Sequence, residues 1–424
     1  MLEVALVFAV LLLFIFLGFP IYMSTIITAV IFTLYMGMPL DMVVIKMFGS
    51  INSFSLMAIP FFIIAGNIMM KAKITDKLVN FAKACVGQLN GGLGHVNILT
   101  SMLFGGIQGS GAADASAIGG MLIPAMEKQG YAKDHAVAVT AASSMLSPII
   151  PPSIAMILFS FYTEVPVGQL FMGGLIPGIM IGLMQMVVNA VSCKRRGYTF
   201  KNEKFSFKGL YKAFISSIGA LVMPMIILLG IVFGIVTPTE SGVLAIVYGL
   251  LYGFFGTKEL KVSHLPKILL SSAVTTAVVM MTIAGAGALS QVLVRLRFQN
   301  EVLDFAVNVI QNRYLATFFL MAVLMVLGCF LDPTVLIAMF AITVLNCGNA
   351  LGFNPIHYGV IMVIIMQVGA ITPPVGTFLF ISCGIADLPL EKSVRALMPY
   401  LITILLAVVI MVFVPQIVTF LPFL

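Results

Sequence analysis

The sequence has little charge and no tryptophan. Only 9% of its 424 residues are Asp, Glu, Lys or Arg, whereas 61% are hydrophobic. Soluble domains carry charge on about a quarter of their residues. This balance excludes an ordinary soluble protein and predicts an all-α polytopic membrane protein. Because there is no Trp, the aromatic belt at the lipid–water interface would consist of tyrosine.

Motifs for metal, redox and nucleotide chemistry are also missing. The five cysteines show no CxxC spacing and the four histidines do not cluster with them, so we expect these residues to be packing residues rather than metal ligands. No GxxxxGK[ST] sequence occurs, which argues against ATP as the driving force. We therefore expect a protein that is not an enzyme.

Apolar segments long enough to cross a membrane run along the chain, since a crossing needs about 20 apolar residues. The first segment lacks a basic start and a small-residue cleavage site, so it is predicted to be a membrane helix and not a removed signal peptide. The predicted spans are 3–19, 22–37, 55–71, 133–163, 168–192, 214–236, 240–256, 267–289, 355–385 and 395–420.

Four apolar regions are interrupted. The spans 133–163 and 355–385 are too long for one straight helix and carry Pro-Pro in the middle, which predicts two broken helices. The regions 95–128 and 313–350 are broken halfway by Gly, Ser, Asp or Pro and are predicted to be re-entrant hairpins. The amphipathic segments 71–88 and 294–313 lead into these hairpins, and we interpret them as interfacial arm helices.

The basic residues predict the orientation. With the N-terminus outside, all but four of the 22 Lys and Arg fall in inner loops, which is the bias of a cytoplasmic membrane. This placement predicts a cytoplasmic (inner) membrane and accounts for the net charge of +7 without a nucleic-acid partner. The basic segment 193–213 is predicted to be a cytoplasmic linker between the halves 1–192 and 214–424.

The two halves have similar residues, mostly glycines and prolines that interrupt helices, at positions 222 residues apart. Five spans separate the two hairpins, and an odd number places the second copy upside down. Inverted repeats with paired interruptions are typical of secondary transporters, whose substrate and ion sites lie near the midplane. The matching pairs are Gly130 with Gly352, His135 with His357, Pro151-Pro152 with Pro373-Pro374, Pro177 with Pro399, and Ser110-Gly111 with Asp332-Pro333.

Each hairpin tip, together with the break opposite it, is predicted to form an oxygen-rich cage for a sodium ion, the coupling ion. Broken helices free backbone carbonyls that can coordinate a hard cation, and hydroxyls beside the breaks add further oxygens. A hydroxyl in a membrane helix can instead bond the preceding turn. The candidate metal ligands are Ser110, Ser147 and Pro148 in the first half, and Gly328, Asp332, Gly369 and Thr372 in the second.

The candidate substrate ligands are Ser110, Gly111, Asp332 and Arg295. Helix starts at the tips present N–H groups to an anion, and an arginine offers a bidentate partner for a carboxylate. Two alternatives stay open: Asp332 caps the helix that follows it, and Arg295 contacts lipid phosphate. Asp114, which lies beyond the first tip, is expected to be a cap or a polar contact.

The motifs "GGIQGSGAADASAIGG", "LSPIIPPS" and "GAITPPVG" occur in this order over nearly the whole chain. In these motifs the chain resembles the large membrane subunit of TRAP transporters, the tripartite ATP-independent periplasmic transporters of bacteria. The resemblance implies an elevator mechanism, sodium coupling, a small membrane subunit and a periplasmic binding protein that delivers an organic acid. The chain looks most like the sialic-acid type, although C4-dicarboxylate transporters share these motifs.

Other function classes fit these residues less well. A sodium-coupled carboxylate transporter or a sodium/proton exchanger would work without a binding protein, but an exchanger wants carboxylates in the breaks, and the breaks at 143–155 and 367–377 contain none. An intramembrane aspartyl protease would have to bring Asp114 and Asp332 together. A channel fits two occluding hairpins poorly. Finally, the glycines of residues 104–120 could serve helix packing alone.

Overall fold

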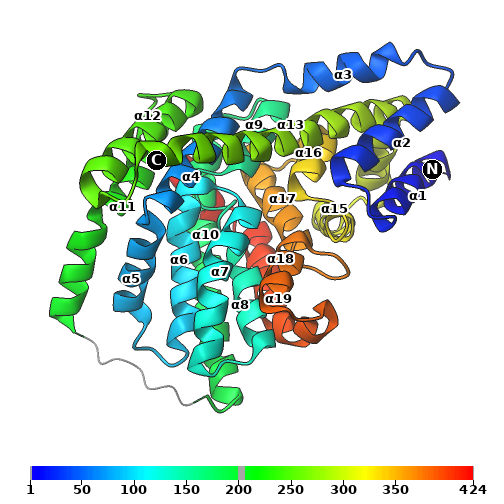
Figure 1. Ribbon diagram of the computed structural model, residues 1–424. Helices are drawn as coiled ribbons and strands as arrows, with labels where there is room; N and C mark the ends of the chain where they lie inside the picture. Colours follow the sequence, from blue (N-terminus) through cyan, green and yellow to red (C-terminus); the bar gives the residue numbers. More distant parts are fainter. Residues whose placement is uncertain (1, 199–205, 424) are drawn as a thin grey trace.

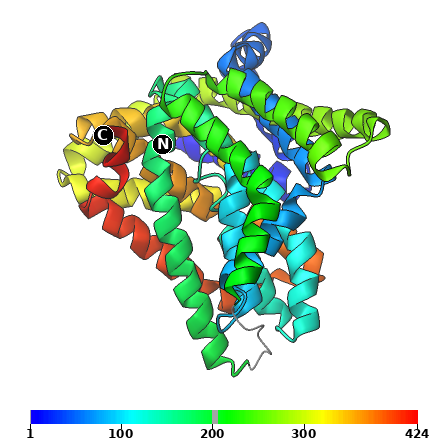
Figure 2. The ribbon, with the colours of Figure 1, turned by 90° about the vertical axis from the view of Figure 1, so that its left-hand side faces the viewer.

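The computed structural model describes residues 2–198 and 206–423. The described residues form helices joined by short loops, with no β-strand among them, which confirms the all-helical prediction (Figures 1 and 2). Six helices of the described chain are long and apolar enough to cross a membrane, or up to seven if one bent pair counts as a single span. The six are Val167–Arg195, Phe207–Val232, Pro238–Thr257, Val262–Arg295, Pro333–Ala350 and Leu390–Phe413.

The N-terminal segments are shorter than predicted. Helices α1 (Leu2–Phe16) and α2 (Ile21–Tyr35) have 15 residues each, because Gly18, with a left-handed φ of 87°, and Pro20 interrupt the apolar run between them. The span predicted for 55–71 is one arm of a bent pair. The helix α3 (Asp41–Ile51) meets the segment Ser55–Lys71, formed by η1 (Ser55–Met57) and α4 (Ala58–Lys71), at 66°.

The predicted linker 193–213 is too wide at both ends. Helix α10 (Val167–Arg195) continues through Arg195, and α11 (Phe207–Val232) starts at Phe207. Both helices are mainly apolar and carry their basic residues at the end next to the linker. Long basic side chains at a helix end can extend into water, so they do not stop the helix. Residues 199–205, in the centre of the predicted linker, lie outside the described residues.

The first interrupted region and the first broken helix form one bundle. Figure 1 shows α5, α6, α7 and α8 side by side, and neighbouring members of this group pack against one another. Helices α6 and α7 form the first hairpin, and α8 and α9 are the two halves of the broken helix. The bounds are α5 Ile74–Val86, α6 Gly92–Gln108, α7 Gly111–Gln129, α8 Lys133–Ser144 and α9 Ile154–Thr163.

The second half contains the same series of elements. After α12 (Pro238–Leu251) and the long α13 come an arm, a hairpin (α15 and α16), a broken helix (α17 and α18) and a long helix. Their bounds are α13 Leu265–Arg295, α14 Phe298–Asp304 with η4 Phe305–Val309, α15 Arg313–Gly328, α16 Pro333–Ala350, α17 Pro355–Gly369, α18 Thr377–Ala386 and α19 Leu390–Phe413.

The offset of 222 recurs in the contacts of the two halves. Helices α7 and α16 start at Gly111 and Pro333, and α8 and α17 start at Lys133 and Pro355. The His135 Nε2 atom lies 3.1 Å from the Asn189 side-chain oxygen, and His357 Nε2 lies 2.8 Å from the Met411 carbonyl oxygen. Since Asn189 and Met411 are also 222 apart, each histidine ties its broken helix to the long helix after it.

Helix α13 lies across the molecule and links its parts. It packs on α2, α3, α4 and α16, and α4 packs on α12. Helix α1 contacts the second half through Phe8, whose ring lies 6.0 Å from Phe298 and 6.4 Å from Phe340. The helices α2, α4 and α13 therefore form a wall, and the two hairpins lie beside it.

Candidate functional site

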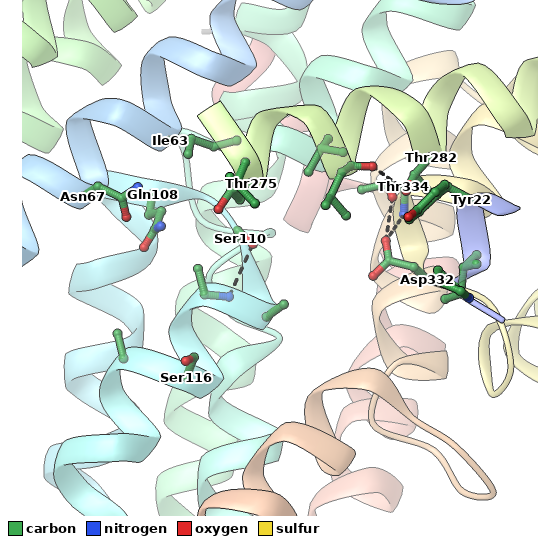
Figure 3. Close-up of a pocket in the computed structure, with 18 of the residues that line it drawn as sticks. Tyr22, Ile63, Asn67, Gln108, Ser110, Ser116, Thr275, Thr282, Asp332 and Thr334 are labelled. Atoms are coloured by element: carbon green, nitrogen blue, oxygen red, sulfur yellow. Dashed lines mark hydrogen bonds between the residues drawn. The ribbon is translucent and has the colours of Figure 1, made fainter. Parts of the chain in front are cut away.

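A cavity of about 650 Å³ lies between that wall and the two hairpin tips. Figure 3 shows α13 above the cavity and Ser110 and Asp332 pointing toward it from the starts of α7 and α16. A smaller cavity of about 60 Å³ shares Ser110, Asp332 and Thr334 with the large one, and reaches Pro148 at the first break and Gln367 beside the second. The interrupted elements of both halves therefore meet at one place.

The first tip is seated against the first break. Gly109 has a φ of 63°, and a Cβ atom there would lie 2.3 Å from the Pro152 carbonyl oxygen. The Ile154 N–H donates a hydrogen bond to the Gly109 carbonyl at 3.3 Å. Only glycine combines the left-handed backbone with so close an approach. The Ser110 hydroxyl then caps α7 by accepting from the Ala113 N–H at 3.5 Å.

The second tip is seated against the second break in the same manner. The Gly376 N–H donates to the Cys329 carbonyl at 3.1 Å, and Gly376 lies 222 residues after Ile154. A Cβ atom on Gly369 would lie 2.5 Å from the Gly328 Cα atom. The two predicted ligand positions Gly328 and Gly369 are thus in direct backbone contact.

The other predicted sodium ligands differ in the hydrogen bonds that their oxygen atoms already make. The Ser147 hydroxyl is buried and has no hydrogen-bond partner within the described part of the chain. The Pro148 carbonyl accepts from Ser153 Oγ at 2.5 Å, and the Thr372 hydroxyl donates to the Val368 carbonyl at 2.7 Å. Carbonyl and hydroxyl oxygens keep a second lone pair when they make one such bond, so each can still coordinate a cation.

Asp332 is the one charged side chain among the described residues that line the two cavities. Its Oδ1 atom accepts hydrogen bonds from the Thr334 N–H at 2.9 Å and from the Thr334 hydroxyl at 2.6 Å. Asp332 therefore caps α16, and Pro333 occupies the first helical position, where its missing N–H costs nothing. The capping role is observed, and the carboxylate borders the cavity as well.

Arg295 lies apart from this cavity. It is exposed in the last turn of α13, about 20 Å along the helix axis from the cavity residue Thr282 at a rise of about 1.5 Å per residue. The structure brings the predicted substrate ligands Ser110, Gly111 and Asp332 together at the small cavity and does not bring Arg295 to them.

Several cavity residues were missed by the sequence reasoning. Gln108, directly before the first tip, is buried with its side-chain oxygen unpaired among the described residues, and it packs against Gly66 of α4. Asn67 donates to Ser272 Oγ at 2.7 Å. A neutral polar residue inside an apolar helix is the signal that could have found them. The remaining polar lining residues are Tyr22, Ser116, Thr275, Thr282 and Thr334.

The lining suits binding of a polar molecule rather than bond breaking. Hydroxyl and amide groups, one carboxylate and the starts of α7 and α16 surround the space. The protease alternative needs two aspartates in one site, but Asp114 is fully buried inside the first hairpin and lines neither cavity that Asp332 lines. The geometry therefore gives that alternative no support.

Comparison with known proteins agrees with the resemblance. The sequence matches the family described as "Tripartite ATP-independent periplasmic transporter, DctM component" over residues 8–417. It is 31% identical to the sialic acid TRAP transporter large permease of Vibrio cholerae, over 96% of this chain and 95% of that protein. It is 32% identical to the C4-dicarboxylate TRAP transporter large permease of Pseudomonas aeruginosa, over 89% and 88%.

A third relative is the 2,3-diketo-L-gulonate TRAP transporter large permease of Escherichia coli, 31% identical over 87% of this chain and 86% of that protein. These relatives are transporter permeases and not enzymes, and the apolar helices agree with a location in the bacterial inner membrane. With nearly the full length matched, the chain belongs to the DctM family of large permease subunits of TRAP transporters.

Proposed function

We propose that this permease imports an organic acid, of the sialic-acid or C4-dicarboxylate type, by sodium-coupled secondary transport. A periplasmic binding protein hands over the substrate, and a small membrane subunit completes the complex. The observation that carries the proposal is the cavity bounded by both hairpin tips on one face and by α2, α4 and α13 on the other. Its position is the one expected of a transport site between paired interrupted helices.

The seating of each tip on its own break supports the sodium sites. Ser110 and Pro148 line the small cavity beside the first contact, and Ser147 precedes Pro148 in the chain. At the second contact Gly328 touches Gly369, Thr372 lies against Gly376, and Asp332 lines the same cavity. The buried and unpaired Ser147 hydroxyl is the strongest single indication, because a buried hydroxyl without a partner costs about 1–3 kcal/mol. A sodium ion there would remove that cost. Sodium in this proposal is transported cargo.

The helix start at the first tip supports an acidic substrate. At the start of α7, the N–H groups of Gly111 and Ala112 have no partner within their own helix, and both residues line the small cavity. The start of α16 offers no such group, because Pro333 lacks an N–H and the Thr334 N–H is bonded to Asp332. Ser110 and Gly111 would bind a carboxylate, and the hydroxyl and amide groups of the lining would bind the rest of a polar acid. Asp332 would hold the sodium ion and bind a substrate hydroxyl. The named substrates of the three relatives, each an acid, agree with this class.

An elevator mechanism gives Arg295 a place in this scheme. The tips now lie beside Thr275 and Thr282 on α13. Movement of the hairpins and broken helices along α13, as one inverted-repeat unit, would carry the tips toward Arg295 at the other end of this helix. Arg295 would then pair with the substrate carboxylate on the outer side.

Uptake into proteoliposomes tests the proposal. The permease is reconstituted with its small subunit and binding protein, and organic-acid uptake is compared with an inward sodium gradient and with potassium in place of sodium. We expect uptake only with sodium, and at least about a tenfold loss in Asp332→Ala, since one charge-assisted contact is worth about 1.4 kcal/mol or more.

Two further variants separate charge from folding. Asp332→Asn keeps the helix cap and removes the charge, so it should lose uptake while its melting temperature stays near that of wild type. Glu259→Gln, which changes an exposed acid paired with Lys73, is the matched control and should transport normally. Equal uptake in sodium and potassium would overturn sodium coupling.

A further inference from the structure

A buried polar cluster inside the first hairpin takes no part in the transport site. It joins α6, α7 and α8, and all of its side chains are fully buried. We name it the Asp114 cluster, after its one ionisable member, which lies four residues beyond Ser110. Its members are Asn97, Ser101, Asp114, Thr140, Ser143 and Ser144.

Almost every donor in the Asp114 cluster is committed to a partner other than the carboxylate. The Thr140 hydroxyl donates to the Ala136 carbonyl at 2.9 Å and receives the Asn97 side-chain N–H at 2.7 Å. Ser143 donates to the Asn97 side-chain oxygen at 3.0 Å, and Ser144 donates to the Thr140 carbonyl at 2.7 Å. These four groups therefore stabilise one another.

The carboxylate itself receives one hydrogen bond. Ser101 Oγ donates to Asp114 Oδ2 at 2.7 Å, whereas Oδ1 has no hydrogen-bond partner among the described residues. The described groups that act on this carboxylate are the Ser101 and Ser144 hydroxyls, with no Lys, Arg or His among them. An ionised carboxylate buried with one donor and no opposing charge would cost several kcal/mol.

The ionisable groups on the helices packed around α7 are bonded elsewhere. They lie toward other ends of α6, α8 and α18, so none supplies the missing charge. Their partners are the Asn90 carbonyl for His95, the Ala386 carbonyl for Lys133, Arg196 for Asp134, Asn189 for His135 and Ser393 for Cys383.

The second half shows that the hairpin fold does not need this polarity. At the offset of 222, Asp114 corresponds to Leu336, and the three α8 members correspond to Met362, Ile365 and Met366. All four are buried and apolar. Because the same hairpin and broken helix form there with apolar residues at these four positions, the polar residues of the first hairpin have a reason other than folding.

We propose that Asp114 is a proton-binding site: a neutral carboxylic acid that carries its proton on Oδ1, the oxygen without a hydrogen-bond partner among the described residues. The proton removes the charge, and a neutral carboxyl group costs far less to bury than a carboxylate. A sodium ion fits less well, because Asp114 lines none of the described cavities and an ion needs several more oxygens and space.

The proposed proton changes what the first hairpin can tolerate. If Asp114 lost it, an uncompensated negative charge would lie in the buried interior of the hairpin, one turn from the tip that borders the transport cavity. The proton therefore stabilises the packing of α6, α7 and α8 on one another. This assignment does not depend on the proposed substrate or on sodium coupling, and it can be tested without any transport measurement.

Infrared spectroscopy of the full-length permease, purified with its small subunit at about pH 7, tests the assignment. A free aspartate is ionised at that pH, since its ordinary pKa is about 3.9. We expect a carboxylic-acid C=O band in wild type that is lost in Asp114→Asn and retained in the matched control Asp134→Asn. Ser101→Ala should move this band to higher frequency, because its carbonyl oxygen no longer accepts a hydrogen bond.

Two results would overturn the proposal. One is a difference spectrum, wild type minus Asp114→Asn, that contains only carboxylate bands and no carboxylic-acid band. This result would mean that Asp114 is ionised. The other is a carboxylate band that shifts when sodium replaces potassium, which means that the site holds a metal ion. If Asp114→Asn does not fold, the Ser101→Ala shift decides by itself, because a band that stays in place would also overturn the assignment.

Discussion

The two hairpins share one backbone design and differ in what fills it. Each tip carbonyl accepts a hydrogen bond from its own break, and each contact requires glycine. The first hairpin, however, encloses the Asp114 cluster, whereas the corresponding α16 and α17 positions are apolar. Glycine contacts therefore specify the architecture in both halves, whereas the residues at the Asp114 cluster and its counterpart positions are polar in the first half and apolar in the second.

The largest expected effect comes from placing an aspartate at Leu336, the position in the second half that corresponds to Asp114. Leu336→Asp should reduce the free energy of unfolding by at least about 4 kcal/mol, because it removes a buried leucine and adds a polar group with no partner. Melting temperature and the yield of monodisperse protein in detergent measure this loss. Leu336→Met keeps the apolar volume and should cost under about 1.5 kcal/mol. Equal stability of the two variants would refute the contrast between the hairpins.

Changes at the glycines of the two tip–break contacts should affect both halves alike. Gly109→Ala and Gly369→Ala should each cost about 3 kcal/mol, because the new Cβ meets backbone atoms that cannot move aside. Thermal unfolding in detergent checks this. Gly384→Ala is the matched control, since nothing lies within 4 Å of a Cβ atom there. A loss in one half alone would show that the tip–break contacts are not equivalent.

The two helix caps should differ in strength. Asp332→Ala should cost about 1–2 kcal/mol, because its carboxylate accepts two short hydrogen bonds from Thr334. Ser110→Ala should cost under about 1 kcal/mol, since its bond to the Ala113 N–H is 3.5 Å long. Chemical denaturation of the two variants side by side measures the difference, and the reverse order would contradict it.

The smallest effect concerns an ion pair that only the first half has. Arg196 binds the Asp134 carboxylate at 2.9 and 2.7 Å, whereas the positions 222 residues later, Ile356 and Val418, are buried and apolar. Asp134→Asn should cost at most about 1 kcal/mol, and this cost should shrink at high salt. The more exposed pair of Lys73 and Glu259 is the control, and Glu259→Gln should change stability by less. Melting temperatures at low and high salt check both.

Much of this fold could be predicted from the prolines and glycines that interrupt apolar segments. The bounds predicted for the first broken helix, 133–163, match α8 and α9, and those of the second interrupted region, 313–350, match α15 and α16. Proline and glycine act locally, so they are visible in the sequence. The bend between α3 and α4 and the packing of α1 on the second half were not predicted, because they depend on contacts between segments far apart in the chain.

The candidate site was predictable in part for the same reason. The residues at the breaks, such as Ser110 and Asp332, lie where the sequence interrupts an apolar run, and both border the cavity. The wall residues Asn67, Thr275 and Thr282 were missed because they lie within helices that continue through them. Arg295 marks a further limit, since sequence position alone does not tell which turn of a long helix faces the cavity.

The seated tips have a consequence for how a gate can work here. Lifting either tip alone would break the bond from Ile154 to Gly109 or from Gly376 to Cys329, and would leave two buried backbone groups unpaired, at about 1–3 kcal/mol each. These hydrogen bonds therefore oppose the opening of one hairpin tip by itself. In the proposed transport cycle we therefore expect each tip and its break to move together, with these two hydrogen bonds kept.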